Sequence, residues 1–364
     1  MFKEVTFQNL RCFKDFTLTD MTPVTLISGR NNVGKTTVLE GIFLLLRYRS
    51  IADTFITINL FRGLEHHNFT PQGFVMELNP THLWETLFAG LDMEQEMRIS
   101  MKDHAGLTRT LHLAKDTQFS ITTFKHNKPQ PMLPAPGSYA LKLEHKNGMG
   151  PESTETGWLI LTQAGMTFNF DTPPHLPLPP FVIYGSPNTR PGQQVVAEWL
   201  GHIELKNKKE LLTKKLHLLC EEIEDIFTVP RNGTINIFSR LQNGNSLPLR
   251  TMGDGINTLL HYLAVMIANP GGIFLFDEIE TGFHYSFYPK LWELVAAVAK
   301  ETGSQVIATT HSYECISAAV EGTSKIDPLL LTYFRLGEED AGIVPYSYSS
   351  EDLAYALEQE MEIR

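Results

Sequence analysis

A glycine-rich segment with one lysine and two threonines is the first part of the chain whose residue types suggest chemistry. Gly29 to Thr36 fits the pattern G-x-x-x-x-G-K-[ST] and follows the apolar run VTLI. Glycines at this spacing let backbone N–H groups curl around phosphate oxygens, and the start of a helix adds positive potential. Lys35 would then reach the β- and γ-phosphates of ATP, and the Thr36 hydroxyl would bind Mg²⁺. The predicted phosphate-binding residues are Gly29, Arg30, Asn31, Asn32, Val33, Gly34, Lys35, Thr36 and Thr37.

Two adjacent acids end a second apolar run, GGIFLFDE. Unpaired carboxylates at the end of a buried strand cost free energy, so Asp277 and Glu278 need a partner such as a cation. Asp277 would support Mg²⁺ through water, and Glu278 would accept a proton from an attacking water. The alternative is an acidic strand end that faces solvent, which a phosphate loop in the same chain disfavours.

A histidine and a glycine pair give two further candidates. His311 follows the apolar run VIATT, and a histidine at a strand end beside a catalytic carboxylate can contact a γ-phosphate. Its position favours this role over that of a structural histidine. Gly253, Asp254 and Gly255, in TMGDGI, could open a helix, although a turn in which Asp254 caps that helix explains them equally well.

The elements around these residues predict an α/β fold. Apolar strands precede the glycine-rich loop, the two acids and the histidine, and amphipathic or apolar helices alternate with them. Strands that alternate with helices predict a mainly parallel sheet, whose ligands bind at the carboxyl ends of its strands. Residues 50 to 180 favour antiparallel strands, residues 208 to 227 have helical spacing, and residues 234 to 241 are typical of a strand.

The composition limits the kind of protein. The net charge of −11 repels a phosphate backbone, and the densest basic run, at 206 to 215, is interpreted as the solvated face of a helix. No apolar run is long enough to span a membrane and no signal peptide is evident, so we expect a cytoplasmic protein. Cys12, Cys220 and Cys315 lie too far apart to suggest a metal knuckle or a disulfide framework.

Taken together, GRNNVGKT, TMGDGI, FLFDE and TTHS resemble the ABC-type ATPases of the RecF, SMC and OLD group, also described as AAA15/AAA21-like. The opening FQNLRCFKDF and the extended acidic motif DEIETGFHY are similar to that group as well. The resemblance is strongest to OLD-like bacterial ATPases, including subunits of phage-defence systems such as PARIS and Gabija. It covers residues 1 to 47 and 246 to 364.

This resemblance implies a P-loop NTPase fold, an ABC-type head with an antiparallel β lobe and a helical signature lobe. It implies that Lys35 binds phosphate, that Thr36 and Asp277 bind Mg²⁺, that Glu278 is the general base and that His311 is the switch histidine. It also implies an ATP-dependent dimer, in which Gly253 to Gly255 of one copy complete the site of the other.

Two features depart from the family pattern, the signature and the length of the C-terminal segment. The signature reads TMGDGI instead of Ser-Gly-Gly-Gln or Ser-Gly-Gly-Glu, and Asp254 would bring negative charge near the γ-phosphate. Gln193 and Gln194 are the candidates for the Q-loop glutamine. Residues 312 to 364 are too few for the Toprim nuclease domain of full-length OLD proteins, so the expected effector is a separate protein. The C-terminal residues 347 to 364 would contact it, unless they form a frayed terminal helix.

We therefore expect one discontinuous ABC-type head over residues 1–364. Residues 1–50 and 246–364 would form the nucleotide-binding core, and residues 51–245 would insert a β lobe and a helical segment. The predicted function is that of an Mg-dependent ATPase that senses or scaffolds in anti-phage defence and controls a separate nuclease or toxin. The alternative is a RecF-like clamp that closes on DNA, which the acidic charge disfavours; a nucleotide-binding assembly protein without hydrolysis is disfavoured by Glu278.

Overall fold

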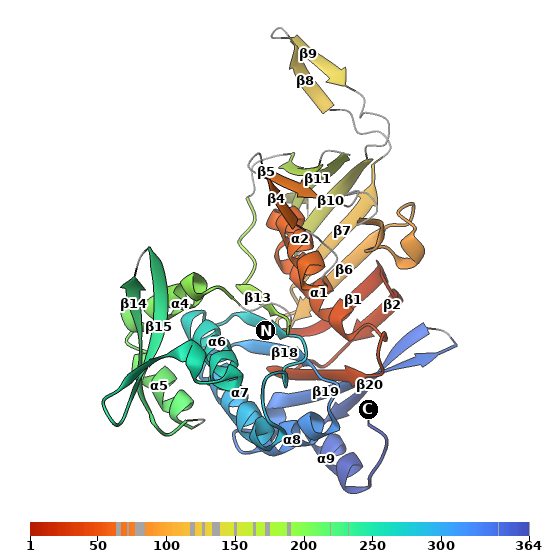
Figure 1. The fold of residues 1–364 in the computed structure, drawn as a ribbon. Coiled ribbons are helices and arrows are strands. Elements are labelled where there is room, and N and C mark those ends of the chain that lie inside the picture. The colour runs from red at the N-terminus through yellow and green to blue at the C-terminus, as the bar shows by residue number, and fades with distance from the viewer. Residues whose placement is uncertain are drawn as a thin grey trace.

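The computed structural model describes most of the chain, and Figure 1 shows its arrangement. The described residues are 1–62, 67–70, 73–76, 84–116, 121–125, 128–132, 139–148, 151–162, 165–171, 175–187, 191–218, 220–231, 233–340 and 342–363. Three parts are visible: a central sheet flanked by helices, a larger sheet above it, and a small helical and β region at one side.

The central sheet has six strands in the order β13-β17-β18-β3-β19-β20. Their bounds are Val182–Gly185 (β13), Ile273–Phe276 (β17), Gln305–Thr309 (β18), Val24–Gly29 (β3), Leu331–Glu339 (β19) and Gly342–Ser349 (β20). Neighbours are parallel except for β20, which returns antiparallel to β19. Strands β3, β17 and β18 are buried at every position, as expected for strands covered on both faces.

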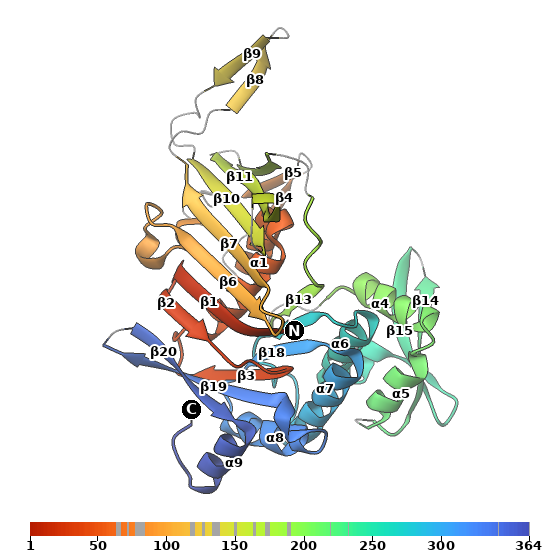
Figure 2. The ribbon, with the colours of Figure 1, turned by 180° about the vertical axis from the view of Figure 1, so that it is seen from behind.

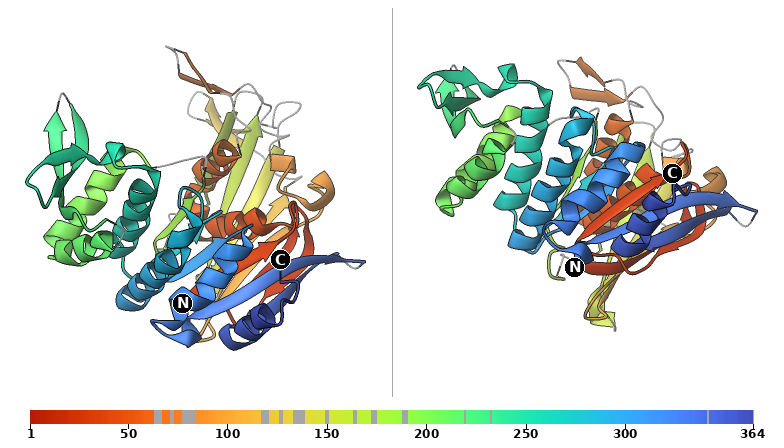
Figure 3. Two further views of the ribbon diagram at one scale, coloured as in Figure 1. Left: turned by 60° about the horizontal axis from the view of Figure 1, so that its bottom comes forward. Right: turned by 90° about the horizontal axis from the view of Figure 1, so that it is seen from below.

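Helices cover both faces of the central sheet. Helix α1 (Lys35–Leu46) lies between this sheet and the larger one, and 11 of its 12 residues are buried. Helices α6 (Asp254–Ala268), α7 (Tyr288–Thr302) and α8 (Tyr313–Ser324) lie side by side against the opposite face (Figure 3), and α9 (Ser350–Glu358) follows β20. Apart from Glu40, which is buried and paired with Arg62, the sequence LEGIFLLL is apolar because α1 has no solvent face.

The larger sheet is antiparallel and has seven strands in the order β12-β11-β10-β7-β6-β1-β2, seen from behind in Figure 2. The bounds are Gly165–Phe170 (β12), Thr154–Thr162 (β11), Tyr139–Asn147 (β10), Thr108–Lys115 (β7), Met97–Asp103 (β6), Phe2–Leu10 (β1) and Phe13–Leu18 (β2). Helix α2 (Ile51–Phe61) covers it together with α1. Two hairpins complete this part, β4–β5 (His67–Thr70, Gly73–Met76) and β8–β9 (Ile121–Lys125, Lys128–Met132).

The side region corrects one prediction from the sequence. It contains α4 (Gln193–Leu205), α5 (Lys209–His217) and a sheet of β14 (Ile223–Arg231), β15 (Thr234–Leu241) and β16 (Ser246–Pro248). The helix predicted over 208 to 227 was wrong in its second half, because it ends at His217 and β14 begins at Ile223. Residues 223 to 231 pair with β15 along their length, and this long-range pairing outweighs local helical spacing.

The fold confirms the predicted class. It is an α/β P-loop ATPase fold with a parallel core, an antiparallel β lobe and a helical side region. The middle of the chain supplies β13 to the edge of the central sheet as well as the strands of the larger one. Within the described residues, no helix combines the length and the apolar character that a membrane span requires.

Candidate active site

The predicted residues meet at one edge of the central sheet. Strands β17, β18 and β3 are adjacent and parallel, so their carboxyl ends bring the two acids, the histidine and the glycine-rich loop together. A cavity of ≈ 910 Å³ opens there. The predicted residues that line it are Asn31, Asn32, Gly34, Lys35, Thr36, Thr37, Asp277, Glu278 and His311. Gly29 and Arg30 line an adjoining cavity of ≈ 720 Å³ with Glu278 and His311, while Val33 is 7% exposed and packs in the core.

The glycine-rich loop needs glycine at two positions. Gly29 has φ +141° and Gly34 has φ +93°, values that residues with a Cβ rarely adopt. A Cβ on Gly34 would lie 2.6 Å from Phe13 Cζ, and one on Gly29 would lie 2.5 Å from the Leu336 carbonyl oxygen. The Val38 N–H donates to the Gly34 carbonyl oxygen (3.0 Å), so the earlier amides of α1 precede its hydrogen-bonded turns and suit an anion.

Lys35 lies across the loop. Its Nζ donates to the carbonyl oxygens of Gly29 and Arg30, both at 2.8 Å. Burial lowers the pKa of this ammonium group, while nearby Asp277 and Glu278 act in the opposite direction. Lys35 is therefore a cation close enough to Asp277 and Glu278 for their charges to affect its pKa, which fits its predicted contact with phosphate.

Three hydroxyl groups contact the Asp277 carboxylate, one each from α1, β13 and β18. Thr36 Oγ1 lies 3.0 Å from Asp277 Oδ2, Thr309 Oγ1 donates to Oδ1 (2.6 Å), and Tyr184 Oη donates to Oδ2 (3.3 Å). Burial raises the pKa of Tyr184 well above its usual value, so its hydroxyl stays a donor. The carboxylate is therefore fixed in orientation next to the predicted Mg²⁺-binding hydroxyl.

Glu278 and His311 form a second pair. His311 Nε2 lies 3.2 Å from Glu278 Oε1, and both side chains are about two-fifths exposed, at 40% and 42%. Glu278 has φ +46°, and its N–H donates to Thr309 Oγ1 (2.9 Å). Glu280 Oε1 accepts from the His311 N–H (3.0 Å). Unusual backbone conformations of this kind concentrate at functional sites, where neighbouring contacts hold them in place.

The signature residues lie elsewhere on the chain. Gly253 (φ +94°) precedes α6, Asp254 begins this helix, and both are exposed. They are not among the residues that line the nucleotide cavity, and Asp254 lines a separate cavity with Gln193 and Arg250. The candidate Q-loop residues Gln193 and Gln194 begin α4 and are likewise not among the lining residues of the nucleotide cavity.

Sequence reasoning missed several residues of the site. Arg11, in the turn after β1, lines the cavity, and two of its nitrogens, Nε and Nη2, are buried without a hydrogen-bond acceptor in the described part of the chain. Burial lowers the pKa of Arg11, although Glu40 lies 3.4 Å away. Glu40 also accepts two hydrogen bonds from Arg62. Arg11 lies in the sequence NLRCF, which contributed to the family resemblance but did not indicate a role for this arginine.

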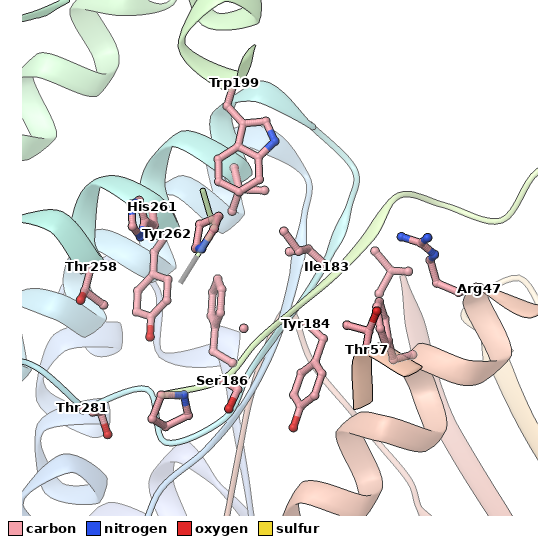
Figure 4. A pocket seen from close by; sticks show the side chains of 17 residues that line it. Arg47, Thr57, Ile183, Tyr184, Ser186, Trp199, Thr258, His261, Tyr262 and Thr281 are labelled. Carbon is pink, nitrogen blue, oxygen red and sulfur yellow. The ribbon is translucent and has the colours of Figure 1, made fainter. Parts of the chain in front are cut away.

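An apolar cavity of ≈ 280 Å³ adjoins the nucleotide cavity at the edge strand β13 (Figure 4). Trp199 of α4 and Tyr262 of α6 line it on one side, and Arg47 and Thr57 lie across β13. Tyr184 lines both cavities and contacts Asp277. Tyr184 therefore lies between the two cavities and contacts Asp277, the residue predicted to support Mg²⁺.

Comparisons with known proteins agree with this site. Residues 1–103 match the family model described as "AAA ATPase domain", and residues 191–317 match "AAA domain, putative AbiEii toxin, Type IV TA system". A Helicobacter pylori protein named "ATP/GTP phosphatase" is 23% identical over 384 residues, which cover 99% of each chain.

Solved structures with a similar outline include two SMC heads. The SMC head domain from Thermotoga maritima is 12% identical, covers 95% of this chain and 98% of its own, and has a TM-score of 0.39. An SMC head bound to the C-winged helix domain of ScpA is 10% identical, covers 99% of both chains, and has a TM-score of 0.49.

The class of protein follows from the site and the matched segments. The structure has a phosphate loop between β3 and α1 and two acids after β17, and two segments of the chain match ATPase domain models. Together these observations define a P-loop ATPase. The segment that carries the loop and the segment that carries the acids and the histidine are each similar to such domains.

Proposed function

We propose that this chain is an Mg-dependent ATPase that acts as a nucleotide-gated switch in bacterial anti-phage defence and controls a separately encoded nuclease or toxin. The observation that carries the enzymatic part is the pairing of Thr36 with Asp277 beside the pair of Glu278 and His311, in one cavity with Lys35. This arrangement supplies phosphate binding, a cation site and a base, which are the parts that phosphoryl transfer to water requires.

The donor set fits a magnesium ion. Thr36 Oγ1 and the Asp277 carboxylate, whose Oδ2 lies 3.0 Å away, are oxygen donors of the kind that Mg²⁺ prefers, and they would hold the ion, Asp277 through water. Within the described residues no group of three or more His, Cys, Asp or Glu could hold a metal. This agrees with a site that takes few ligands from the protein and the rest from phosphate and water. When bound, Mg²⁺ would neutralise charge that develops on the phosphates.

The chain's own groups divide the reaction between them. The amides at the start of α1 and Lys35 Nζ would hold the phosphates, which requires Lys35 to leave the Gly29 and Arg30 carbonyl oxygens. Glu278 would accept the proton of the attacking water, and His311, 3.2 Å away, would orient Glu278 and contact the γ-phosphate. Burial of Lys35 strengthens its attraction for phosphate because few waters screen it.

A second copy of the chain would complete the site. Gly253 and Asp254 are exposed and Gly255 is half-buried, and none of the three is among the residues that line the cavity their own chain forms. This placement supports a dimer in which each nucleotide is closed off by the partner's signature residues. Gly253 has φ +94°, and the space that a Cβ would occupy there is open, so a ligand or a partner backbone could approach closely.

The biological part of the proposal rests on similarity. The family description at residues 191–317 names a toxin of a type IV toxin–antitoxin system, which supports a role in controlled toxicity. The name of the Helicobacter pylori relative includes both ATP and GTP, and we propose that this chain hydrolyses both. The exposed side chains Tyr355 and Met361, at and beyond α9, are candidates for effector contact.

A DNA clamp is less well supported. The basic run at 206 to 215 is largely neutralised within the chain: Lys209 lies 3.1 Å from Asp225, Lys214 lies 2.7 Å from Glu210, and Lys215 lies 2.9 Å from Glu301. Lysines paired in this way contribute less to phosphate-backbone binding, which depends on unneutralised positive charge.

The test is copurification under conditions that trap ATP. Glu278→Gln is expressed with its genomic neighbours, and the complex is weighed by native mass spectrometry, with Lys35→Ala as the variant that cannot hold phosphate. We expect Glu278→Gln to retain nucleotide and a neighbouring nuclease or toxin, and wild-type protein to release the neighbour as it hydrolyses ATP. A bare dimer that retains DNA would contradict the defence switch and favour the clamp.

A further inference from the structure

We propose that Leu91 forms the nucleobase-binding wall of the nucleotide cavity, by packing its apolar side chain against the face of a purine. This inference rests on the proposed binding of nucleoside triphosphates at Lys35 and Thr36. It adds the residue that binds the base, which no motif identifies, and it states which chemistry of the base is recognised.

The backbone holds Leu91 in an unusual conformation. Gly90 has φ +67° and Leu91 has φ +61°, two successive residues in the left-handed region. The turn is closed by hydrogen bonds from the Leu91 N–H to the Phe88 carbonyl oxygen (3.0 Å) and from the Asp92 N–H to the Ala89 carbonyl oxygen (3.3 Å). Glycine, asparagine and aspartate are the usual residues at such positions, so a leucine there is strained.

The side chain of Leu91 is also exposed. It is 63% accessible, whereas Leu87 and Phe88 in the same segment are each 1% accessible. The segment therefore buries its other apolar residues but presents this one to the nucleotide cavity, which Leu91 lines together with Phe88 and Gly90. An apolar side chain that is both strained and exposed, inside a ligand cavity, is explained most simply by contact with the ligand.

The orientation of the nucleotide places the base at this end of the cavity. Glu278 and His311 mark the γ-phosphate end, and Lys35 and Thr36 take the phosphates next to it. The chain of phosphates would then run past Thr37 toward Cys12, which lies beside the loop because its Sγ is 2.7 Å from the position of a Cβ on Gly34. Arg11, the neighbour of Cys12, is hydrogen-bonded to Leu87 in the segment that also contains Leu91, and both Arg11 and Leu91 line the cavity. We therefore place the base of a nucleotide held by the loop against this segment.

The wall is fixed to the same turn that carries Arg11. The Arg11 N–H donates to the Leu87 carbonyl oxygen (2.8 Å), and Leu10 and Phe88 form an antiparallel bridge. Because these contacts connect the wall to the β1–β2 turn, Leu91 and Arg11 keep a fixed spacing. A ligand that places its phosphates on the loop therefore meets a preformed base contact.

The chemistry of leucine sets the expected selectivity. Its side chain offers only apolar surface and neither donates nor accepts a hydrogen bond, so this contact does not separate the 6-amino group of adenine from the 6-oxo group of guanine. Leu91 would therefore contribute equally to the affinity for ATP and for GTP.

The test measures binding of three probes by calorimetry in the presence of Mg²⁺: the non-hydrolysable imido analogues of ATP and of GTP, and tripolyphosphate, which has no base. We expect Leu91→Ser to weaken both analogues by about tenfold, the effect of losing part of one leucine's apolar contact. Binding of tripolyphosphate should not change. Leu91→Met, which keeps an apolar side chain, should bind all three probes like the wild type.

Two further variants separate ligand contact from folding. Leu91→Gly removes the side chain and the backbone strain together, so we expect a thermal midpoint at or above that of the wild type with the same tenfold loss for both analogues. Leu329→Ser is the matched control, because Leu329 is 80% exposed and is not among the residues that line the nucleotide cavity. It should leave all three affinities unchanged.

Three results would overturn the inference in distinguishable ways. Unchanged affinity of Leu91→Ser for the analogues, with binding lost in Lys35→Ala, would reject the base contact and keep the nucleotide site. An equal loss for tripolyphosphate would assign Leu91 a structural role. Failure of the wild type to bind any of the three probes would reject nucleotide binding itself, and this inference with it.

Discussion

Thr309→Val tests whether the site depends on the orientation of Asp277. Thr309 Oγ1 donates to Asp277 Oδ1 (2.6 Å) and accepts from the Glu278 N–H (2.9 Å), so one hydroxyl fixes both acids. Valine has nearly the same shape, and the Thr309 side chain is fully buried, at 0% exposure. The substitution therefore removes two hydrogen bonds without opening a cavity.

The expected cost follows from the two bonds. A hydrogen bond to a charged group contributes about 1.5–3 kcal/mol, and a buried N–H left without an acceptor costs about 1–3 kcal/mol. Asp277 keeps its contacts with Thr36 and Tyr184, which limits the loss. We expect the free energy of unfolding to fall by about 3 kcal/mol and phosphate release to fall by about 10- to 100-fold, the usual range for residues that orient a metal ligand.

Urea unfolding and phosphate release as a function of Mg²⁺ concentration measure the two effects. Thr309→Ser keeps the hydroxyl and should stay close to the wild type in both assays, apart from the loss of one methyl group. Wild-type phosphate release and Mg²⁺ dependence in a folded Thr309→Val protein would refute the role assigned to this hydroxyl.

Two further predictions concern the glycine-rich loop and the β lobe. Gly34→Ala places a Cβ 2.6 Å from Phe13 Cζ at φ +93°, so we expect a loss of about 3 kcal/mol in unfolding free energy. Gly303→Ala, in the left-handed region at φ +65° but in open space at the end of α7, should cost only about 1 kcal/mol for the backbone, and equal losses would refute the steric argument. Burial, with Arg109 nearby, lowers the pKa of His145 from 6.5 to about 3. Between these pH values His145 is protonated in the unfolded chain but neutral in the folded one. The free energy of unfolding should therefore fall as the pH drops from 6.5 toward 3, by at most about 1.4 kcal/mol per pH unit. His145→Phe, which can keep the stacking on Tyr48, should reduce this slope in urea unfolding measured across that range, and an unchanged slope would show that His145 is not its source.

The sequence allowed the fold class and the main site residues to be predicted because their signals are local. Lys35 and Thr36 belong to a short motif between a strand and a helix, and Asp277, Glu278 and His311 end apolar strands. Parallel strands then bring these ends together without further information. The roles of these residues remain predictions that the substitutions above test.

The remaining residues act through contacts between distant parts of the chain. Tyr184 comes from a strand 93 residues before Asp277, and Arg11 and Leu91 reach the cavity from the turn after β1 and from the segment before β6. Short, mixed stretches in the middle of the chain gave no motif for Tyr184 or Leu91, and the sequence NLRCF gave no role for Arg11. The strand β14 was missed for a similar reason, since its pairing with β15 is visible only in three dimensions.

Phosphate release from ATP, with and without Mg²⁺, tests the central claim most directly when the wild type is compared with Glu278→Gln. The site predicts Mg²⁺-dependent release by the wild type and a loss of at least about 100-fold in Glu278→Gln, because general-base catalysis contributes that much or more. The variant should still bind ATP, since Lys35 and Thr36 are intact, whereas Lys35→Ala should not. Equal rates for the wild type and Glu278→Gln, or release that persists in EDTA, would contradict hydrolysis at this site.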